Sequence, residues 1–464
     1  MRKGKTGIKS RLLIVFVIIF FVPIAWVSIV RFEGEKPLME THGPMKTLNA
    51  AQKLTFTASD MKSGLRKIRI ALIKDGKEII LYAKEFASTG LLLTGLVNKQ
   101  TFFIKDIEPK KIGLRDGKAI LQISVTDYSW RNWLRGNITY LEKEVVIDTK
   151  PPIIDIFTKM HNITQGGSGL VVYKISEPCS KTGVYVGDVF FPGYSGYFKD
   201  PDILLSFFAL DYGEKGRSKI FVQAVDESGN VSKAGFYYYI KNRKFKADVI
   251  NISDGFLNYK IPELESEISS IVDTNKKSML DQFLLINRHL REANFKKISE
   301  LVSNTDNVLY WQKKFLRLPK AAEKAAFADT RTYKYKGKVI DHQTHLGIDL
   351  ASVAHASVPA ANKGKVKFAD FLGIYGKTVL IDHGFGLFSM YSHLSNIDVN
   401  EGQVVLKGDQ IGHTGKTGLA GGDHLHFSML VNKTFVNPLE WWDDNWIKNN
   451  ITLKLDSVRS RLKN

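Results

Sequence analysis

The sequence predicts a multidomain, mainly β protein with an N-terminal transmembrane helix, two β-sandwich modules, a helical connector and a C-terminal antiparallel β-sheet domain. Three observations predict this architecture. A long uncharged apolar run lies near the N-terminus, short alternating hydrophobic runs fill residues 46–239, and histidine and glycine concentrate after residue 340. A chain of 464 residues is also too long for one ordinary hydrophobic core.

The apolar run at residues 12–30 predicts a single membrane-spanning helix. It has 19 residues without a charge, close to the ~20 that cross a bilayer as a helix. Basic residues precede it, at Arg2, Lys3, Lys5, Lys9 and Arg11. We therefore expect the N-terminus in the cytoplasm and the ectodomain in the periplasm or outside the cell. A cleaved signal peptide is the alternative, although its apolar region is usually shorter, about 7–15 residues, and ends in small residues.

The charge of the chain indicates an anionic partner. The formal net charge is +19, which favours nucleic acid, anionic lipid or an anionic cell wall. The sequence has no zinc-finger spacing and no arginine-rich tract, and the ectodomain is expected to be exported. We therefore do not expect a nucleic-acid partner. The single cysteine, Cys179, excludes an intramolecular disulfide and a cysteine-based metal site.

Residues 46–239 are predicted to form β-sandwich modules. Hydrophobic residues alternate in short runs such as 65–72 and 119–125, with turn residues between them. A weak repeat about 100 residues apart, one sandwich length, places Asp127 and Asp226 at corresponding strand ends, each before a turn closed by asparagine. The two modules resemble bacterial surface immunoglobulin-like repeats. Either they bind envelope proteins or they serve as a spacer.

After residue 260 the apolar spacing becomes helical. Pro262 suits a first helical turn, and Leu264, Ile268, Ile271 and Val272 form one apolar face. A packed helical connector is the simpler interpretation. The alternative is a plug or lid over the region that follows.

The C-terminal region carries the candidate chemistry. Eight of the eleven histidines lie between residues 342 and 426, among glycine turns and short Val/Ile/Leu strands. His345 and Asp349 form an H-x-x-x-D motif, His393 lies in YSHLS, and His424 and His426 form an H-x-H motif. On a strand, both members of the H-x-H point to one face. Two imidazoles and one carboxylate suit zinc and leave a fourth position for water, although the spacing alone does not say which of His424 and His426 binds the metal.

The combination of these motifs resembles the lysostaphin/LytM-type zinc metallopeptidases, which are bacterial peptidoglycan endopeptidases. The matching segments are HLGIDLA, SVPAANKGKV, GIYGKTVLIDHGFG, YSHLS, GQVVLKGDQIGHTGKTG and HLHF, within residues 334–440. The resemblance implies that His345, Asp349 and His426 bind one Zn²⁺ and that His393 and His424 are the catalytic histidines. This sequence departs from the family pattern at two positions. Asp423 stands where proline is common, and His355 stands where a small residue is common. The flanking sequence resembles an envelope-anchored subgroup with a large N-terminal ectodomain.

From these observations we expect seven segments: a basic cytoplasmic tip (1–11), a transmembrane anchor (12–30), immunoglobulin-like module 1 (31–148), immunoglobulin-like module 2 (149–245), a helical connector (246–330), a zinc metallopeptidase domain (331–445) and a C-terminal tail (446–464).

The expected function is zinc-dependent hydrolysis of peptide cross-links in peptidoglycan by a protein held in the inner membrane. A catalytically silent LytM-type scaffold that activates other wall hydrolases is the main alternative. Such relatives usually lack some of the zinc ligands, whereas all five motif positions are filled here. An adhesion or assembly protein that works through its β modules is the third possibility.

Overall fold

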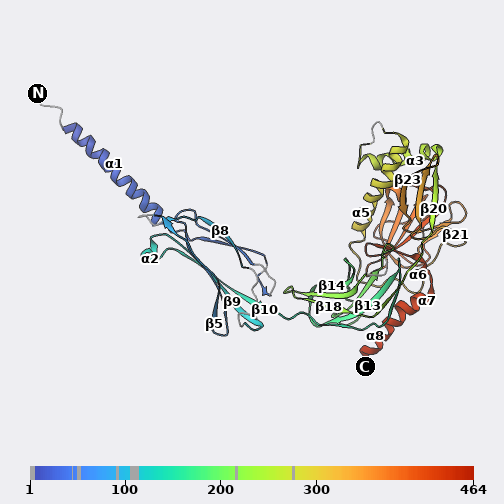
Figure 1. The fold of residues 1–464 in the computed structure, drawn as a ribbon, viewed down its shortest axis with the longest axis horizontal. Helices are drawn as coiled ribbons and strands as arrows, with labels where there is room; N and C mark the ends of the chain where they lie inside the picture. The colour runs from blue at the N-terminus through green and yellow to red at the C-terminus, as the bar shows by residue number, and fades with distance from the viewer. Residues whose placement is uncertain are drawn as a thin grey trace. The chain divides into compact units, whose positions relative to one another are not determined.

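The computed structural model describes residues 6–463 except 44, 50–53, 90–93, 105–113, 215–217 and 274–276 (Figure 1). The chain forms two compact units, Met1–Pro151 with Val225–Val231, and Pro152–Ala224 with Ser232–Asn464. Each unit is described by itself. Residues 1–5 of the expected basic tip lie outside the described residues.

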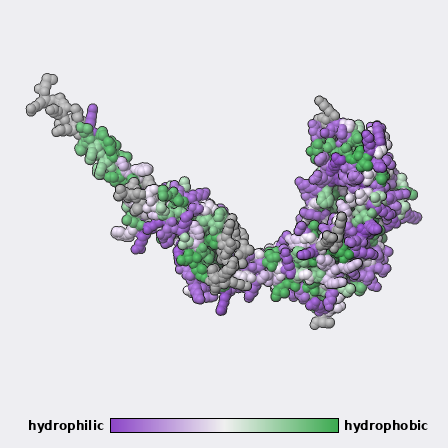
Figure 2. Space-filling view, in the orientation of Figure 1, coloured by the Kyte–Doolittle hydropathy of each residue, from purple (hydrophilic) through white to green (hydrophobic). Residues whose placement is uncertain are grey.

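The apolar run near the N-terminus forms the helix α1 (Thr6–Arg31), which contains Pro23. Its stretch Arg11–Ile29 is long and apolar enough to cross a membrane, and none of it is buried inside the protein. Figure 2 shows this helix as a largely apolar surface. Exposed apolar side chains along a whole helix are typical of a segment that lies in lipid or in a signal sequence.

The remainder of the first unit consists of β-sheets. A three-stranded sheet has the order β1-β3-β8, a five-stranded sheet has the order β2-β10-β9-β4-β5, and β6 pairs with β7. The bounds are β1 (Leu38–His42), β2 (Thr47–Leu48), β3 (Leu54–Ser59), β4 (Leu65–Lys74), β5 (Lys77–Glu85), β6 (Ser88–Thr89), β7 (Thr94–Gly95), β8 (Lys99–Ile104), β9 (Gly117–Asp127), α2 (Arg131–Leu134) and β10 (Ile138–Ile147).

Alternating side chains build the core of this unit. In β9, Leu121, Ile123 and Val125 point inward and are almost fully buried, while the residues between them are more exposed. The larger sheets supply one continuous hydrophobic cluster, as expected for two sheets packed face to face. The turn between β4 and β5 has Asp75 and Gly76 at positive φ, the backbone that a two-residue hairpin requires.

The second unit begins with further small sheets, of order β11-β13-β16, β12-β19 and β15-β14-β17-β18. Their bounds are β11 (Ile154–Ile156), β12 (His161–Thr164), β13 (Ser168–Ile175), β14 (Cys179–Val186), β15 (Val189–Pro192), β16 (Ile203–Ala209), β17 (Ile220–Asp226), β18 (Val231–Gly235) and β19 (Tyr238–Lys241). The strand β16 is buried along its whole length, so both of its faces are covered.

The segment expected to be a helical connector, residues 246–330, contains strands as well as helices. Its elements up to residue 301 are β20 (Ala247–Ile252), α3 (Asp254–Ser269), α4 (Met279–Leu285), the π-helix η1 (Ile286–Leu290) and α5 (Arg291–Leu301). The helix α3 starts earlier than the sequence predicted, because Ser253 caps it by accepting a hydrogen bond from the N–H of Phe256. Pro262 therefore lies inside the helix and not in its first turn.

A long sheet forms the centre of the C-terminal region. Its order is β21-β24-β32-β28-β27-β26-β30, with β33 paired to β32, and two smaller sheets have the orders β25-β31-β29 and β20-β22-β23. The bounds are β21 (Ala322–Ala325), β22 (Thr330–Tyr335), β23 (Lys338–Thr344), β24 (Ile348–Ala351), β25 (Ser357–Pro359), β26 (Gly364–Phe371), η2 (Gly373–Tyr375), β27 (Lys377–Asp382), β28 (Leu387–Leu394), β29 (Asn396–Ile397), β30 (Val404–Val405), β31 (Gln410–His413), β32 (Leu425–Val431) and β33 (Thr434–Val436).

The chain ends in short helices, α6 (Pro438–Trp442), α7 (Asp444–Ile447), η3 (Lys448–Thr452) and α8 (Leu453–Lys463). Trp441 is fully buried and packs edge-on against Trp311 and Phe315. The segment treated as a tail in the sequence is thus helical and contributes Ile451 and Val458 to the core.

Candidate metal centre

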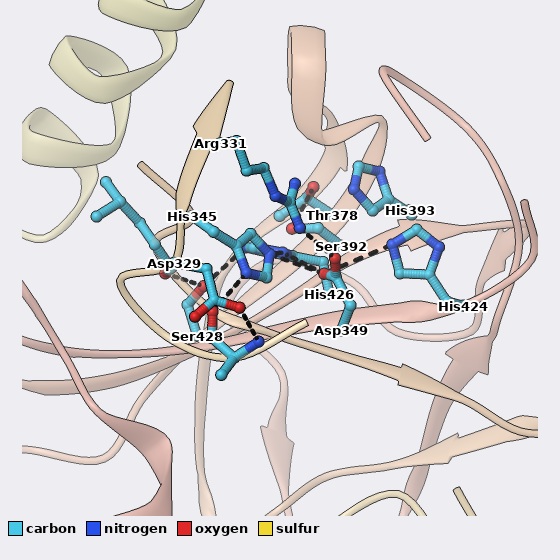
Figure 3. Close-up of polar contacts among 12 residues, drawn as sticks. Asp329, Arg331, His345, Asp349, Thr378, Ser392, His393, His424, His426 and Ser428 are labelled. Atoms are coloured by element: carbon cyan, nitrogen blue, oxygen red, sulfur yellow. Dashed lines mark hydrogen bonds and ion pairs between the residues drawn. The ribbon is translucent and has the colours of Figure 1, made fainter. Parts of the chain in front are cut away.

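Three of the predicted site residues converge on one point (Figure 3). The Nε2 atom of His345, the Nδ1 atom of His426 and the Oδ1 atom of Asp349 lie 2.9 Å from one another in each pair. All three residues are buried. Such a group of two imidazole nitrogens and one carboxylate oxygen is a candidate ligand set for a metal ion.

Strand pairing brings these residues together. The strand β24 pairs antiparallel with β32, and Asp349 lies opposite His426 in that register. His345 precedes β24 and is held by two backbone hydrogen bonds, to Ala328 and Asp329. Gly347 lies midway between His345 and Asp349 in the sequence, and a Cβ added there would lie 2.6 Å from the ring of His426. Glycine is therefore required for the close approach of the two strands.

Neighbouring hydrogen-bond acceptors fix which ring nitrogen of His345 and of His426 faces Asp349. The Nδ1–H of His345 donates to the carbonyl oxygen of Ala326, at 2.9 Å, so Nε2 keeps its lone pair. The hydroxyl of Ser428 donates to the carbonyl oxygen of Leu346 and accepts from Nε2 of His426, at 3.1 Å, so Nδ1 of His426 keeps its lone pair. Metal-ligating histidines characteristically donate their other ring N–H in this way.

Asp349 is oriented by an arginine that the sequence analysis did not single out. The guanidinium Nη2 of Arg331, on β22, donates to Oδ2 of Asp349 at 2.8 Å, which leaves Oδ1 toward His345 and His426. Burial alone would raise the pKa of Asp349. Electrostatic attraction to His345 and the contacts with His424 and His426 outweigh burial and hold that pKa well below its ordinary value.

The two remaining predicted histidines flank the centre. His393 lies on β28 and His424 directly before β32, with their ring centroids 4.9 Å apart. The Nδ1–H of His393 donates to the carbonyl oxygen of Thr417, and that of His424 donates to the carbonyl oxygen of Gly422. The Nε2 atom of each ring is therefore the one that can exchange a proton, and Nε2 of His424 lies 3.5 Å from Oδ1 of Asp349.

The surroundings give these two histidines different protonation tendencies. Burial, followed by repulsion from the neighbouring histidines, holds the pKa of His393 well below its ordinary value. Burial would also lower the pKa of His424, but its hydrogen bond with Asp349 and the charge of that carboxylate raise it overall. His393 also has a φ of 63°, a left-handed backbone conformation that is uncommon for a side chain of this size. Outliers of this kind concentrate at functional sites.

A cavity of about 410 Å³ opens beside the centre. Asp349, His393 and His424 line one side of it, and the segment Ile250–Ser253, Phe256 and Phe283 of the connector line the other. The connector helices are fastened to loops next to the site, because Glu263 of α3 accepts from the N–H of Gly418 and Asn294 of α5 accepts from the N–H of Ile374. The helices thus form one wall of the space beside the centre.

The other histidines of the region lie outside the convergent group. His383 is fully buried, bonds Ser389 and the carbonyl of Lys363, and has its pKa lowered to about 4 by burial. His342 contacts Thr332 on the neighbouring strand. His355 and Asp423, the two residues that differ from the family pattern, contact each other. The backbone N–H of His355 donates to the carboxylate of Asp423. Arg331 and the backbone carbonyls that orient the rings carry no motif, so the sequence offered no signal for them.

Residues 343–438, which include all five predicted site residues, match peptidase family M23. The C-terminal domain is a peptidase family M23 domain. The M23 domain is 39% identical, over 95 residues, to DD-carboxypeptidase/endopeptidase Mpg of Neisseria meningitidis serogroup B, which is 20% of this chain and 22% of that protein. It is 32% identical, over 116 residues, to peptidoglycan DD-endopeptidase ShyB of Vibrio cholerae, which is 25% of this chain and 26% of that protein.

The chain spans only about a quarter of the length of these curated relatives. Among solved structures, the catalytic domain of lysostaphin from Staphylococcus simulans is 25% identical, with 28% of this chain and 96% of that chain covered and a TM-score of 0.24.

Proposed function

We propose that this protein is a zinc-dependent endopeptidase that hydrolyses peptide cross-links of bacterial peptidoglycan. The observation that carries the proposal is the convergence of Nε2 of His345, Oδ1 of Asp349 and Nδ1 of His426 within an M23 domain. One relative named above is a peptidoglycan DD-endopeptidase and the other is a DD-carboxypeptidase/endopeptidase, and these names support the same substrate class here.

The residues present fit a zinc ion. Zinc prefers nitrogen and oxygen ligands of this type, and catalytic sites commonly use three protein ligands with one position open. The hydrogen bonds from Arg331, Ala326 and Ser428 leave one lone pair of each ligand directed at the centre. We propose His345, Asp349 and His426 as the ligands of one Zn²⁺.

A bound zinc ion would polarise the scissile carbonyl and make a water molecule a better nucleophile. Side chains of the protein must then take the proton from the attacking water and deliver a proton to the leaving amine. His393 and His424 are the candidates, because each has its Nδ1–H committed to a carbonyl and its Nε2 free. We propose that one of them accepts the proton of the attacking water while the other stabilises the developing oxyanion or donates to the leaving amine.

The bond cleaved is proposed to be a DD cross-link, in line with the names of the relatives. We further propose that α1 anchors the protein in the inner membrane with its N-terminus inside, and that the two β regions are immunoglobulin-like modules that hold the M23 domain away from the membrane. The segment boundaries given in the sequence analysis belong to the same proposal, with a cleaved signal sequence as the alternative for α1.

The proposal is tested with the purified full chain in detergent. Zinc content is measured by elemental analysis, and products released from purified sacculi are identified by mass spectrometry. We expect about one zinc per chain and release of muropeptides that stops with a chelator and returns with zinc.

A chain that binds no zinc and releases no muropeptide, but stimulates a second wall hydrolase, would contradict the enzyme and support the scaffold. A chain that binds zinc and cleaves a different peptide bond would refute only the DD assignment.

A further inference from the structure

Another group of potential metal ligands lies in the first unit and consists of three carboxylates. Oxygen atoms of Glu33, Asp60 and Asp127 all lie within 4.8 Å of one another. The three residues are 7%, 6% and 0% exposed. Three carboxylates that are removed from water and face one another are strongly unfavourable unless something neutralises them.

Two of the three carboxylates are held rigidly by the backbone. Asp60 follows β3, and its Oδ1 accepts from the N–H groups of Ser63 and Gly64, both at 2.8 Å. Asp127 ends β9, and its Oδ1 accepts from the N–H of Asn137 at 2.7 Å. These bonds fix where the carboxylates point.

Glu33 provides a second, independent observation that points to a bound cation. It lies two residues beyond the end of α1, and its Oε1 accepts from the hydroxyl of Ser63 at 2.9 Å. Its Oε2 is buried and has no hydrogen-bond partner among the described residues. Burial raises the pKa of Glu33, and the charges of Asp60 and Asp127 raise it further against the bond from Ser63. Burial likewise raises the pKa of Asp127.

We propose that Glu33, Asp60 and Asp127 bind a calcium ion at the start of the first β unit, directly after the apolar helix. The donors are all oxygens, which suit a hard cation and not zinc or copper. Calcium fits better than magnesium, because magnesium keeps several waters and is seldom held by a cage of protein carboxylates. The two positive charges of a calcium ion would offset most of the negative charge of the three carboxylates. The ion would also give Oε2 of Glu33 a partner.

Calcium would tie the segment leaving α1 to the ends of two strands that lie far apart in the sequence. Glu33 is in the entry segment, whereas Asp60 and Asp127 follow or end β3 and β9. The ion would therefore stabilise the part of the unit closest to the helix. This inference does not depend on the proposed peptidase activity, because it uses no residue of the M23 domain.

The test is calcium binding by the full chain in detergent, with zinc supplied to all samples. Calcium bound per chain is counted by equilibrium dialysis, and thermal unfolding is followed with and without calcium. We expect one calcium ion with a Kd of about 10⁻⁴–10⁻³ M, the range of extracellular calcium modules, and a higher Tm with calcium.

The informative variant is Glu33→Gln, because glutamine keeps an oxygen for Ser63 and replaces the unpartnered oxygen with an uncharged amide. We expect it to lose the calcium ion and the rise in Tm, and to unfold at a higher temperature than the wild type when calcium is absent. The matched control is Glu35→Gln, which removes an exposed glutamate that bonds Lys62 and should leave the calcium response unchanged.

Absence of calcium binding by the wild-type chain would overturn the proposal. So would a Glu33→Gln chain that still binds calcium as tightly as the wild type. If Glu33→Gln raises the Tm equally with and without calcium, Glu33 is a neutral buried acid and the proposal is also wrong.

Discussion

At the scale of single residues, the orientation of the histidines in the candidate metal centre depends on uncharged carbonyl and hydroxyl groups. Each of the four histidines that surround Asp349 has one ring nitrogen bonded to a carbonyl or a hydroxyl oxygen and the other directed inward. If a ring could adopt either tautomer, its inward nitrogen would carry a lone pair in only one of the two. The carbonyls of Ala326, Thr417 and Gly422 therefore prepare the site before any ligand arrives.

Substitution of the histidines should separate metal binding from proton transfer. We expect His345→Ala to lose zinc, and His393→Ala to retain about one zinc per chain while its turnover falls by roughly 10²–10⁴-fold. The check is elemental analysis together with the rate of muropeptide release. A His393→Ala chain that cleaves at nearly the wild-type rate would refute the catalytic assignment.

Arg331 should act on the metal through Asp349. Its guanidinium holds Oδ2 of that carboxylate, and loss of such an outer partner typically weakens metal binding by about 10–100-fold. We expect Arg331→Met to show this loss in a competition titration with a zinc chelator. Lys338→Met, which removes an exposed basic residue from the neighbouring strand β23, should keep the wild-type affinity.

At the scale of elements, strand register and helix contacts shape the site. Pairing of β24 with β32 places Asp349 opposite His426, and pairing of β28 with β32 places Ser392, the neighbour of His393, opposite the same residue. The helix α3 then reaches the loop after β31. Its Lys260 is almost fully buried, pairs with Glu263 at 2.8 Å and donates to the carbonyl of Lys416.

The contact between α3 and this loop should be sensitive to loss of Lys260. Removal of one member of a fully buried ion pair typically costs about 3–5 kcal/mol, and the cost should be smaller here because the side chain of Glu263 is 28% exposed and water screens part of its charge. We expect Lys260→Met to lower the Tm and to speed hydrogen exchange at Gly418, whose N–H bonds Glu263. Lys277→Met, at an exposed position before α4, is the matched control. Unchanged exchange at Gly418 in Lys260→Met would show that the order of the loop does not depend on Lys260.

At the scale of the second unit, a half-buried glutamate joins the M23 domain to the sheets that precede it. Glu440 on α6 accepts from the N–H and the hydroxyl of Ser168 on β13. Burial raises its pKa from 4.5 to about 8, against the lowering effect of the Ser168 bonds and of Arg243. The neutral acid is therefore the form that the folded unit prefers at neutral pH.

The stability of this unit should fall as the pH rises. A carboxyl whose pKa is higher in the folded state contributes stability that is complete below its unfolded pKa, here 4.5, and is lost as the pH rises toward about 8. We expect the Tm of the wild type to decrease by on the order of 3 °C per pH unit across this window, from the free energy of one titrating proton.

Glu440→Gln keeps an acceptor for Ser168 and cannot ionise, so its Tm should vary less with pH and exceed that of the wild type above pH 8. Melting curves from pH 5 to 9 check this prediction. Glu401→Gln, at an exposed turn, should follow the wild type. Parallel pH profiles for Glu440→Gln and the wild type would show that this carboxyl does not titrate in the window.

Local composition and short motifs were enough to predict several features of this protein. The apolar helix, the alternating strands such as β4 and β9, the helical spacing after residue 260 and the H-x-x-x-D and H-x-H pairs are all readable because neighbours along the chain set them. The start of α3 was misjudged, since Pro262 gave a stronger local signal than the cap at Ser253.

The contacts between residues far apart in the sequence became visible in the folded chain alone. The fold brought Arg331 to Asp349, set the tautomers through carbonyls of Ala326 and Thr417, and put the connector beside the centre. It also gathered Glu33, Asp60 and Asp127, which no motif links. The physical reason is that these contacts depend on strand register and packing between segments tens to hundreds of residues apart, whereas sequence patterns report mainly on a residue's near neighbours.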